Sequence, residues 1–184
     1  MGMVILIIAV IIIFAIISIY NSLVSARAKV DNAWSQIDVQ LQRRFDLIPN
    51  IVETVKGYAA HESSTLEKVT SLRTSWANAT TVSEKAELNN QLSGALKTIM
   101  AVSENYPDLK ANQNFSELTE ELRNTENKIS FSRQFYNDTV TIYNQKIQVF
   151  PSNIIAGMFG FTARDLFRAD SDEARKNVKV DFGK

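Results

Sequence analysis

The sequence contains no cysteine among its 184 residues, and its one histidine is His61. The absence of thiols excludes disulfide bonds, thiolate-bound zinc and cysteine nucleophiles. A zinc site built on a single histidine would need three carboxylates, which is rare, and the Glu-x-x-His pairs of di-iron bundles do not occur. We therefore expect no metal site and no cofactor.

Glycine and proline are scarce, with 6 and 3 residues respectively. These numbers are low against average usage and favour long helices over strands and turns. Glycine-rich phosphate loops and Gly-x-Ser-x-Gly elbows are absent from the sequence. Since no nucleophile and base stand in a recognisable pattern either, we expect neither an enzyme nor a small-molecule substrate.

A net charge is also missing, because 20 Lys and Arg residues balance 20 Asp and Glu residues. The basic residues are spread evenly and do not form a stripe interleaved with aromatic side chains. The sequence therefore predicts no nucleic-acid partner.

What the sequence does have is a long apolar start. Residues 4–20 are apolar except for Ser18, and the first charged side chain is Arg27. The run spans about 25 Å as a helix, close to the roughly 30 Å hydrocarbon core of a bilayer. With Leu23 and Val24 added, residues 4–24 are expected to contact the bilayer, and residues 1–24 form a transmembrane anchor. A cleaved signal peptide is the alternative, but it requires a basic stretch before the run, and none is there.

Basic residues flank this run on one side only. Arg27, Lys29, Arg43 and Arg44 follow it, and none precedes it. The positive-inside rule then places the N-terminus outside and the remainder in the cytoplasm, as a single-pass protein.

A stripe of apolar residues at three- and four-residue steps predicts one long helix from Asn21 to about Ala77. Pro49 interrupts it without a neighbouring glycine or polar loop. Because proline kinks a helix more readily than it reverses it, we expect a kink near Pro49. The predicted fold is all-α, an elongated antiparallel bundle in which later helices return along a rod. A compact four-helix bundle folded at Pro49 is the alternative.

Two further helices are predicted after the rod. The second begins at a cap, Thr81 or Ser83, and the third at Asn114, where Glu117 completes a capping-box pattern. Pro151 ends the third helix. We expect residues 25–168 to form the bundle and residues 169–184 a charged C-terminal tail. Apolar residues of the third helix stand seven apart, as in a coiled coil: Phe115, Leu122, Ile129, Tyr136, Tyr143 and Phe150.

The stretch RRFDLIPN, residues 43–50, is the first candidate site. Its charges could hold a phosphate or act as an acid–base pair, but phosphate sites add backbone amides from a glycine-rich loop or helix start, which are absent here. We interpret the stretch as a structural kink with ion pairs to later carboxylates. The predicted cluster comprises Arg43, Arg44, Asp46, Pro49, Glu104, Glu121 and Glu126.

The apolar stretch IIAGMFGF, residues 154–161, is the second candidate site. In the elongated fold it returns to the membrane, yet it is too short to span a bilayer. It either contacts the bilayer surface or packs at the base of the bundle. The candidate contact residues are Ile154, Ile155, Met158, Phe159 and Phe161.

Two features of the third helix concern partners. Asn137 and Asn144 stand seven apart; they either set register at a core position or are simply exposed. Phe131, Phe135 and Ile142 fall outside the main apolar seam. A second apolar stripe needs a second neighbour, from the bundle or from another subunit, and we expect a homo-oligomer.

Three long blocks of the sequence resemble the LemA family of bacterial membrane proteins. They are YNSLVSARAKVDNAWSQIDVQLQRRFDLIPNIVETVKGYAAHE, ENYPDLKANQNFSELTEELRNTENKIS and YNDTVTIYNQKIQVFPSNIIAGMFGF. The resemblance implies a transmembrane helix followed by an antiparallel helical bundle, in the bacterial inner membrane. It implies no established enzymatic activity. Some relatives take part in membrane remodelling during magnetosome formation, and others lie near membrane protease or stress genes.

Two functional hypotheses follow from the residues and the resemblance. The first is a membrane-anchored, non-enzymatic helical scaffold that self-associates and organises membrane or partner proteins. The alternative is a monomeric or dimeric adaptor or signalling subunit for a membrane protease or a stress-response partner.

Overall fold

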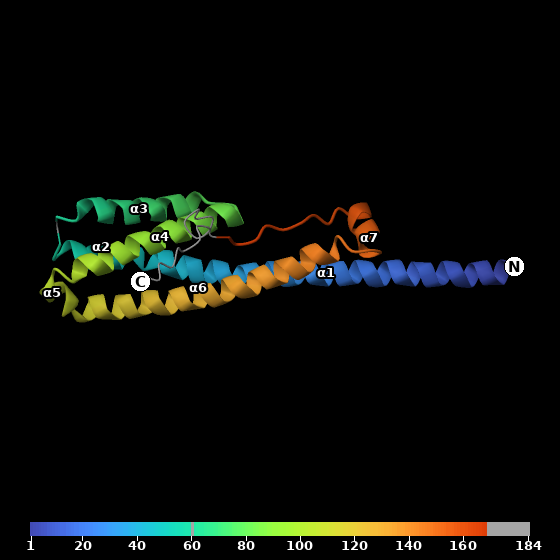
Figure 1. Cartoon of the computed structure of the whole chain (residues 1–184), viewed down its shortest axis with the longest axis horizontal. Helices are drawn as coiled ribbons and strands as arrows, with labels where there is room; N and C mark the ends of the chain where they lie inside the picture. The colour runs from blue at the N-terminus through green and yellow to red at the C-terminus, as the bar shows by residue number, and fades with distance from the viewer. Residues whose placement is uncertain (60, 169–184) are drawn as a thin grey trace, which may run out of the picture.

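The computed structural model describes residues 1–59 and 61–168, and this part of the chain contains seven helices and no strand (Figure 1). The charged tail predicted at residues 169–184 lies outside the described residues. The all-α prediction and the elongated antiparallel bundle are confirmed.

Helix α1, Gly2–Asp46, is the longest element, and helix α2, Ile48–Lys56, continues it after a one-residue break. The break falls at Leu47, whose N–H donates to the carbonyl oxygens of Arg43 and Arg44, both at 3.3 Å. Pro49 lies in the first turn of α2. A missing N–H costs nothing there, because the first turn of a helix has no internal acceptor for it.

The prediction of one helix from Asn21 to Ala77 is wrong. The chain reverses between Gly57 and Glu62, and helix α3, Ser63–Asn78, runs back beside α2 (Figure 1). The apolar spacing continues across the reversal, because α2 and α3 bury their stripes in the same core. Periodicity alone therefore could not reveal the turn, and the alternative reversal at Pro49 is wrong as well.

Helix α4, Val82–Ser103, begins at Thr81, one of the two predicted caps. The Thr81 hydroxyl accepts the Glu84 N–H at 3.2 Å, and the Glu84 carboxylate accepts the Thr81 N–H at 3.0 Å. This is the reciprocal capping box.

The short helix α5, Pro107–Lys110, turns the chain into helix α6, Gln113–Lys146. The cap of α6 is Asn112, which accepts the Phe115 N–H at 3.0 Å, so the prediction of a cap at Asn114 is wrong by two residues. The helix also ends before Pro151.

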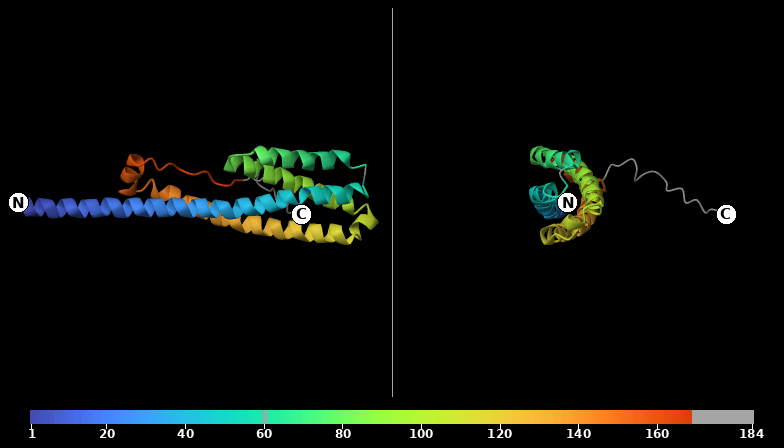
Figure 2. Two further views of the ribbon diagram at one scale, coloured as in Figure 1. Left: turned by 180° about the vertical axis from the view of Figure 1, so that it is seen from behind. Right: turned by 90° about the vertical axis from the view of Figure 1, so that its left-hand side faces the viewer.

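The long helices form two antiparallel pairs that lie side by side. Helices α1 and α6 make a long antiparallel pair, and α3 and α4 pack beside the half of this pair that lies farther from the N-terminus (Figures 1 and 2). Five members of the predicted heptad series on α6, from Phe115 to Tyr143, are buried, whereas Phe150 is 79% exposed. Residues 1–15 are all exposed and project beyond the bundle (Figure 2).

Helix α7, Ser152–Met158, packs against α1 close to the point where α1 leaves the bundle (Figure 1). Gly160 follows with a φ of +69°, a conformation that glycine adopts without strain. Residues 161–168 then run back along α6 without helical structure, and we call them the strap.

Candidate functional site

Arg44 is the centre of the predicted kink cluster. Its side chain is buried, and its Nη1 donates to Asn89 Oδ1 at 2.7 Å and to Ser93 Oγ at 3.0 Å, both on α4. The same nitrogen lies 2.5 Å from Glu126 Oε2 on α6. Burial lowers the pKa of Arg44, and the neighbouring Glu126 carboxylate opposes that shift. Arg44 thus ties the end of α1 to two returning helices through one guanidinium group.

The other members of the predicted cluster are dispersed. Arg43 pairs with Glu121 at 2.5 Å on the surface. Asp46 accepts a hydrogen bond from Gln42 at 2.9 Å, and Glu104 pairs with Lys110 at the far end of the bundle. The structure therefore brings each arginine to one carboxylate, but it does not gather the seven residues at one place.

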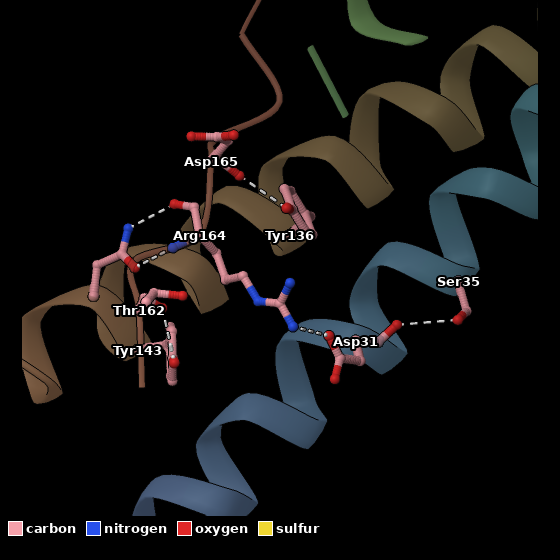
Figure 3. A network of polar contacts seen from close by, with 8 residues as sticks. Asp31, Ser35, Tyr136, Tyr143, Thr162, Arg164 and Asp165 are labelled. Atoms are coloured by element: carbon pink, nitrogen blue, oxygen red, sulfur yellow. Dashed lines mark hydrogen bonds and ion pairs between the residues drawn. The ribbon is translucent and has the colours of Figure 1, made fainter. Parts of the chain in front are cut away.

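A polar network that the sequence did not reveal holds the strap (Figure 3). Asn144 donates to the Arg164 carbonyl at 2.8 Å and accepts the Arg164 N–H at 2.9 Å. Asn137 does the same with Phe167, at 3.1 and 2.8 Å. The seven-residue spacing of the two asparagines was the available signal, and neither of the two interpretations of it anticipated a bound segment.

Two tyrosines on α6 complete this network. Tyr136 donates to the Asp165 carbonyl at 2.8 Å, and Tyr143 donates to the Thr162 carbonyl at 3.0 Å (Figure 3). Burial raises the pKa of both phenols, which keeps them protonated donors. Arg164 also reaches Asp31 on α1 at 3.1 Å, so the strap is joined to both long helices.

Lys85 lies between the two tryptophans of the chain. Its ammonium is 4.8 Å from the ring centroid of Trp76 and 5.6 Å from that of Trp34, and it also pairs with Asp38. Trp76 stacks on Phe45 with 4.4 Å between ring centroids. This cation–π group connects α1, α3 and α4, and the separate sequence positions carried no signal for it.

The side of the α1–α6 pair that faces away from the strap is open. Val39 of α1 and Phe131, Phe135 and Ile142 of α6 are exposed there, and Phe131 is 76% exposed. We call these four residues the stem face. Two shallow hollows of about 640 and 620 Å³ lie along it. The α1 side of the second hollow, opposite Phe135 and Ile142, combines four small residues with three larger polar ones: Ser22, Ser25, Ala26, Ala33, Lys29, Asn32 and Gln36.

The second predicted site divides into two groups. Ile154, Met158 and Phe159 are exposed, with Met158 at 70%, whereas Ile155 and Phe161 are buried in the protein. Phe159 and Phe161 pack on Tyr20 of α1, with ring centroids 4.8 and 5.9 Å away. Part of this segment thus packs at the base of the bundle and part is exposed, and contact of the exposed part with a bilayer stays a prediction.

The geometry offers surfaces for binding. Among residues 1–59 and 61–168, no group of three or more His, Asp or Glu side chains could hold a metal ion. One helix is long and apolar enough to cross a membrane, and its most apolar stretch has no residue buried in the protein. By length and composition, this helix is a candidate membrane span.

Comparisons with known proteins agree with this architecture. The model of the LemA family matches residues 33–182. The chain is 28% identical over 159 residues to Protein LemA of Metamycoplasma hominis, covering 83% of this chain and 73% of that protein. It is 25% identical over 175 residues to the magnetosome proteins MamQ 1 and MamQ 2 of Paramagnetospirillum magneticum.

The alignment with each MamQ protein covers 81% of this chain and 64% of the relative, so the chain spans less than two thirds of their length. None of these names is that of an enzyme. The family match extends over most of the chain, and the fold has the expected long apolar helix and helical bundle. The chain belongs to the LemA family.

Proposed function

We propose that the protein is a membrane-anchored, non-enzymatic scaffold that self-associates through the stem face. The single observation that carries this proposal is the row of exposed apolar side chains on α6, of which Phe131 is 76% exposed. Side chains of this size normally lie inside a protein or in an interface, because their burial releases about 1.5–3 kcal/mol each.

A second copy is the partner that membrane anchoring favours. All copies enter the bilayer in the same direction, so their stems stand parallel and equivalent residues lie at equal height above the membrane. Phe135 and Ile142 of one copy then meet the hollow beside Ala26 and Ala33 of a neighbour. Large side chains that enter a groove beside small residues let two helical surfaces pack closely.

The size of the full-length protein in mild detergent tests the proposal. We expect a discrete assembly for the natural sequence and a monomer for the double variant Phe131→Ser and Phe135→Ser. Ile154→Ser with Met158→Ser is the matched control, since it removes exposed apolar side chains from α7 and leaves the stem face intact.

Two outcomes would contradict self-association through this surface. A natural protein that is monomeric at all concentrations would favour the adaptor hypothesis. Assemblies that persist unchanged in the Phe131 and Phe135 double variant would place the contact elsewhere. The cytoplasmic location of the bundle is part of the same proposal, and protease protection in oriented vesicles tests it.

A further inference from the structure

We infer that α7 and the residues on both sides of it form a membrane-surface foot, which dips into the headgroup region of an anionic bilayer next to the anchor. The foot consists of five exposed apolar residues: Val149, Phe150, Ile154, Met158 and Phe159. The inference rests on the membrane anchoring in the proposed function, and it does not depend on self-association.

The position of α7 along α1 is the first argument. Ile16, Ile19 and Tyr20 are the first residues of α1 that other parts of the chain cover, and the aromatic rings of Phe159 and Phe161 lie on Tyr20. Residues 4–20 span only about 25 Å as a helix, so the last turn of this run is needed to cross a bilayer core of roughly 30 Å. Whatever packs against that last turn lies at bilayer depth.

The distribution of exposure on the segment is the second argument. Ile155 and Ala156 of α7 are buried against the protein, whereas Ile154 and Met158 on the other side of this short helix are exposed. Phe150, 79% exposed, precedes the helix. The segment therefore has one side fixed on the bundle and one apolar side without a partner among the described residues. Phe159 of this segment packs on Tyr20 at the end of the apolar run of α1.

The charges above the foot are the third argument. Residues 1–30 and 139–164 contain no Asp or Glu, but they carry Arg27, Lys29, Lys146 and Arg164. Arg27 lies over the ring of Phe161 at 5.1 Å, and Lys146 donates to Ser22 just beyond the apolar run. Arg164 is paired with Asp31, so Arg27, Lys29 and Lys146 are the charges of this zone that would attract anionic headgroups next to a bilayer.

A foot beside the anchor has a mechanical consequence. A single transmembrane helix leaves a rigid bundle free to rotate and tilt, whereas a second contact at one side of the helix sets a preferred direction. Copies held this way would present the same face at the same angle to the membrane.

The absence of cysteine allows a direct test with the full-length protein in vesicles. Met158→Cys, carrying a fluorescent label, is compared with Ile11→Cys inside the anchor and Ser71→Cys on the exposed side of α3. Nitroxide-labelled lipids quench from inside the bilayer, and iodide quenches from water. Vesicles of phosphatidylcholine alone are compared with vesicles containing phosphatidylglycerol.

We expect shallow nitroxide lipids to quench the Met158 label several-fold more than the Ser71 label, with iodide showing the opposite order. The Met158 label should be better protected from iodide in the vesicles that contain phosphatidylglycerol. If the Met158 label is quenched like the Ser71 label in both kinds of vesicle, the foot is overturned. If the Met158 label is equally protected from iodide in both kinds of vesicle, its preference for anionic lipid is overturned. Protection from iodide without quenching by lipid also overturns it, because protein then covers the site.

The Ile11 label separates this test from the proposed anchoring. If lipids quench Ile11 but not Met158, the anchor holds and the foot fails. If they quench neither, the anchor itself fails. Ile154→Cys is the second labelling position, should the label at Met158 perturb the fold.

Discussion

The side-chain amide of Asn144 forms two hydrogen bonds with the backbone of a single residue, Arg164, one to its carbonyl and one from its N–H. Asn137 repeats this arrangement with Phe167. Seven residues along a helix advance about 10.5 Å, and three residues of extended chain advance about 10 Å. The two asparagines therefore match the strap because the two spacings coincide, and they bind its backbone whatever its side chains are.

This match predicts that Asn144→Ala loosens the strap without unfolding α6. Loss of two hydrogen bonds should cost about 1–2 kcal/mol, which corresponds to roughly a tenfold increase in the open population. Trypsin cleavage after Arg164 measures that population. Asn124→Ala, at an exposed position of the same helix, is the control. Equal cleavage rates in the two variants would contradict the holding role of Asn144.

Removing the buried arginine should destabilise the bundle. We expect Arg44→Ala to lower the free energy of unfolding by about 2–3 kcal/mol, because it leaves Asn89 and Ser93 without a donor and Glu126 without its ion-pair partner. Arg43→Ala should cost less than about 1 kcal/mol, since its pair with Glu121 is exposed. Thermal unfolding of both variants in detergent provides the comparison. If Arg44→Ala were as stable as Arg43→Ala, the structural role of the kink cluster would be refuted.

The cation–π group predicts that replacing Lys85 lowers the stability of the protein. Lys85→Met should destabilise the protein by roughly 1 kcal/mol, because the ammonium loses Trp34, Trp76 and Asp38 together. Lys97→Met, exposed on the same helix, should have no effect. Urea unfolding followed by tryptophan emission suits this test, since both tryptophans of the chain flank Lys85. Equal stability of the two variants would argue against the group.

The capping box predicts a pH dependence at Glu84. Hydrogen bonds from the backbone of Thr81 and Thr80 and from the Thr81 side chain lower the pKa of this carboxylate. A lowered pKa in the folded state means that the stabilisation is complete above the ordinary glutamate pKa of about 4.3 and is lost as the pH falls below it. Glu84→Gln should thus be less stable than the natural protein at pH 7. The difference should narrow toward pH 3, as thermal unfolding at both pH values would show. If the difference in stability between the two proteins stayed constant from pH 7 to pH 3, the stabilising role of the ionised Glu84 carboxylate would be contradicted.

Several parts of this molecule could be predicted from local sequence. The helices α4 and α6 follow from apolar spacing, and Thr81 was one of the two caps that the local sequence offered for α4. The reversal after Gly57 could not be predicted, because two helices that bury their stripes in one core keep the same spacing through the turn. The cap at Asn112 was missed because Asn114 with Glu117 fits the same local pattern.

The candidate sites divide in the same way. The sequence by itself determined that α6 carries a second apolar stripe and that an uncharged, apolar helix leads the chain, because these properties depend only on the order of residues along one element. Only the tertiary structure decided that Arg44 is buried between α4 and α6 while Glu104 lies with Lys110, and that Ile155 is covered while Met158 is exposed. The reason is physical: burial and pairing depend on which distant segments pack against a residue, and that arrangement is set by the whole core and not by neighbours in sequence.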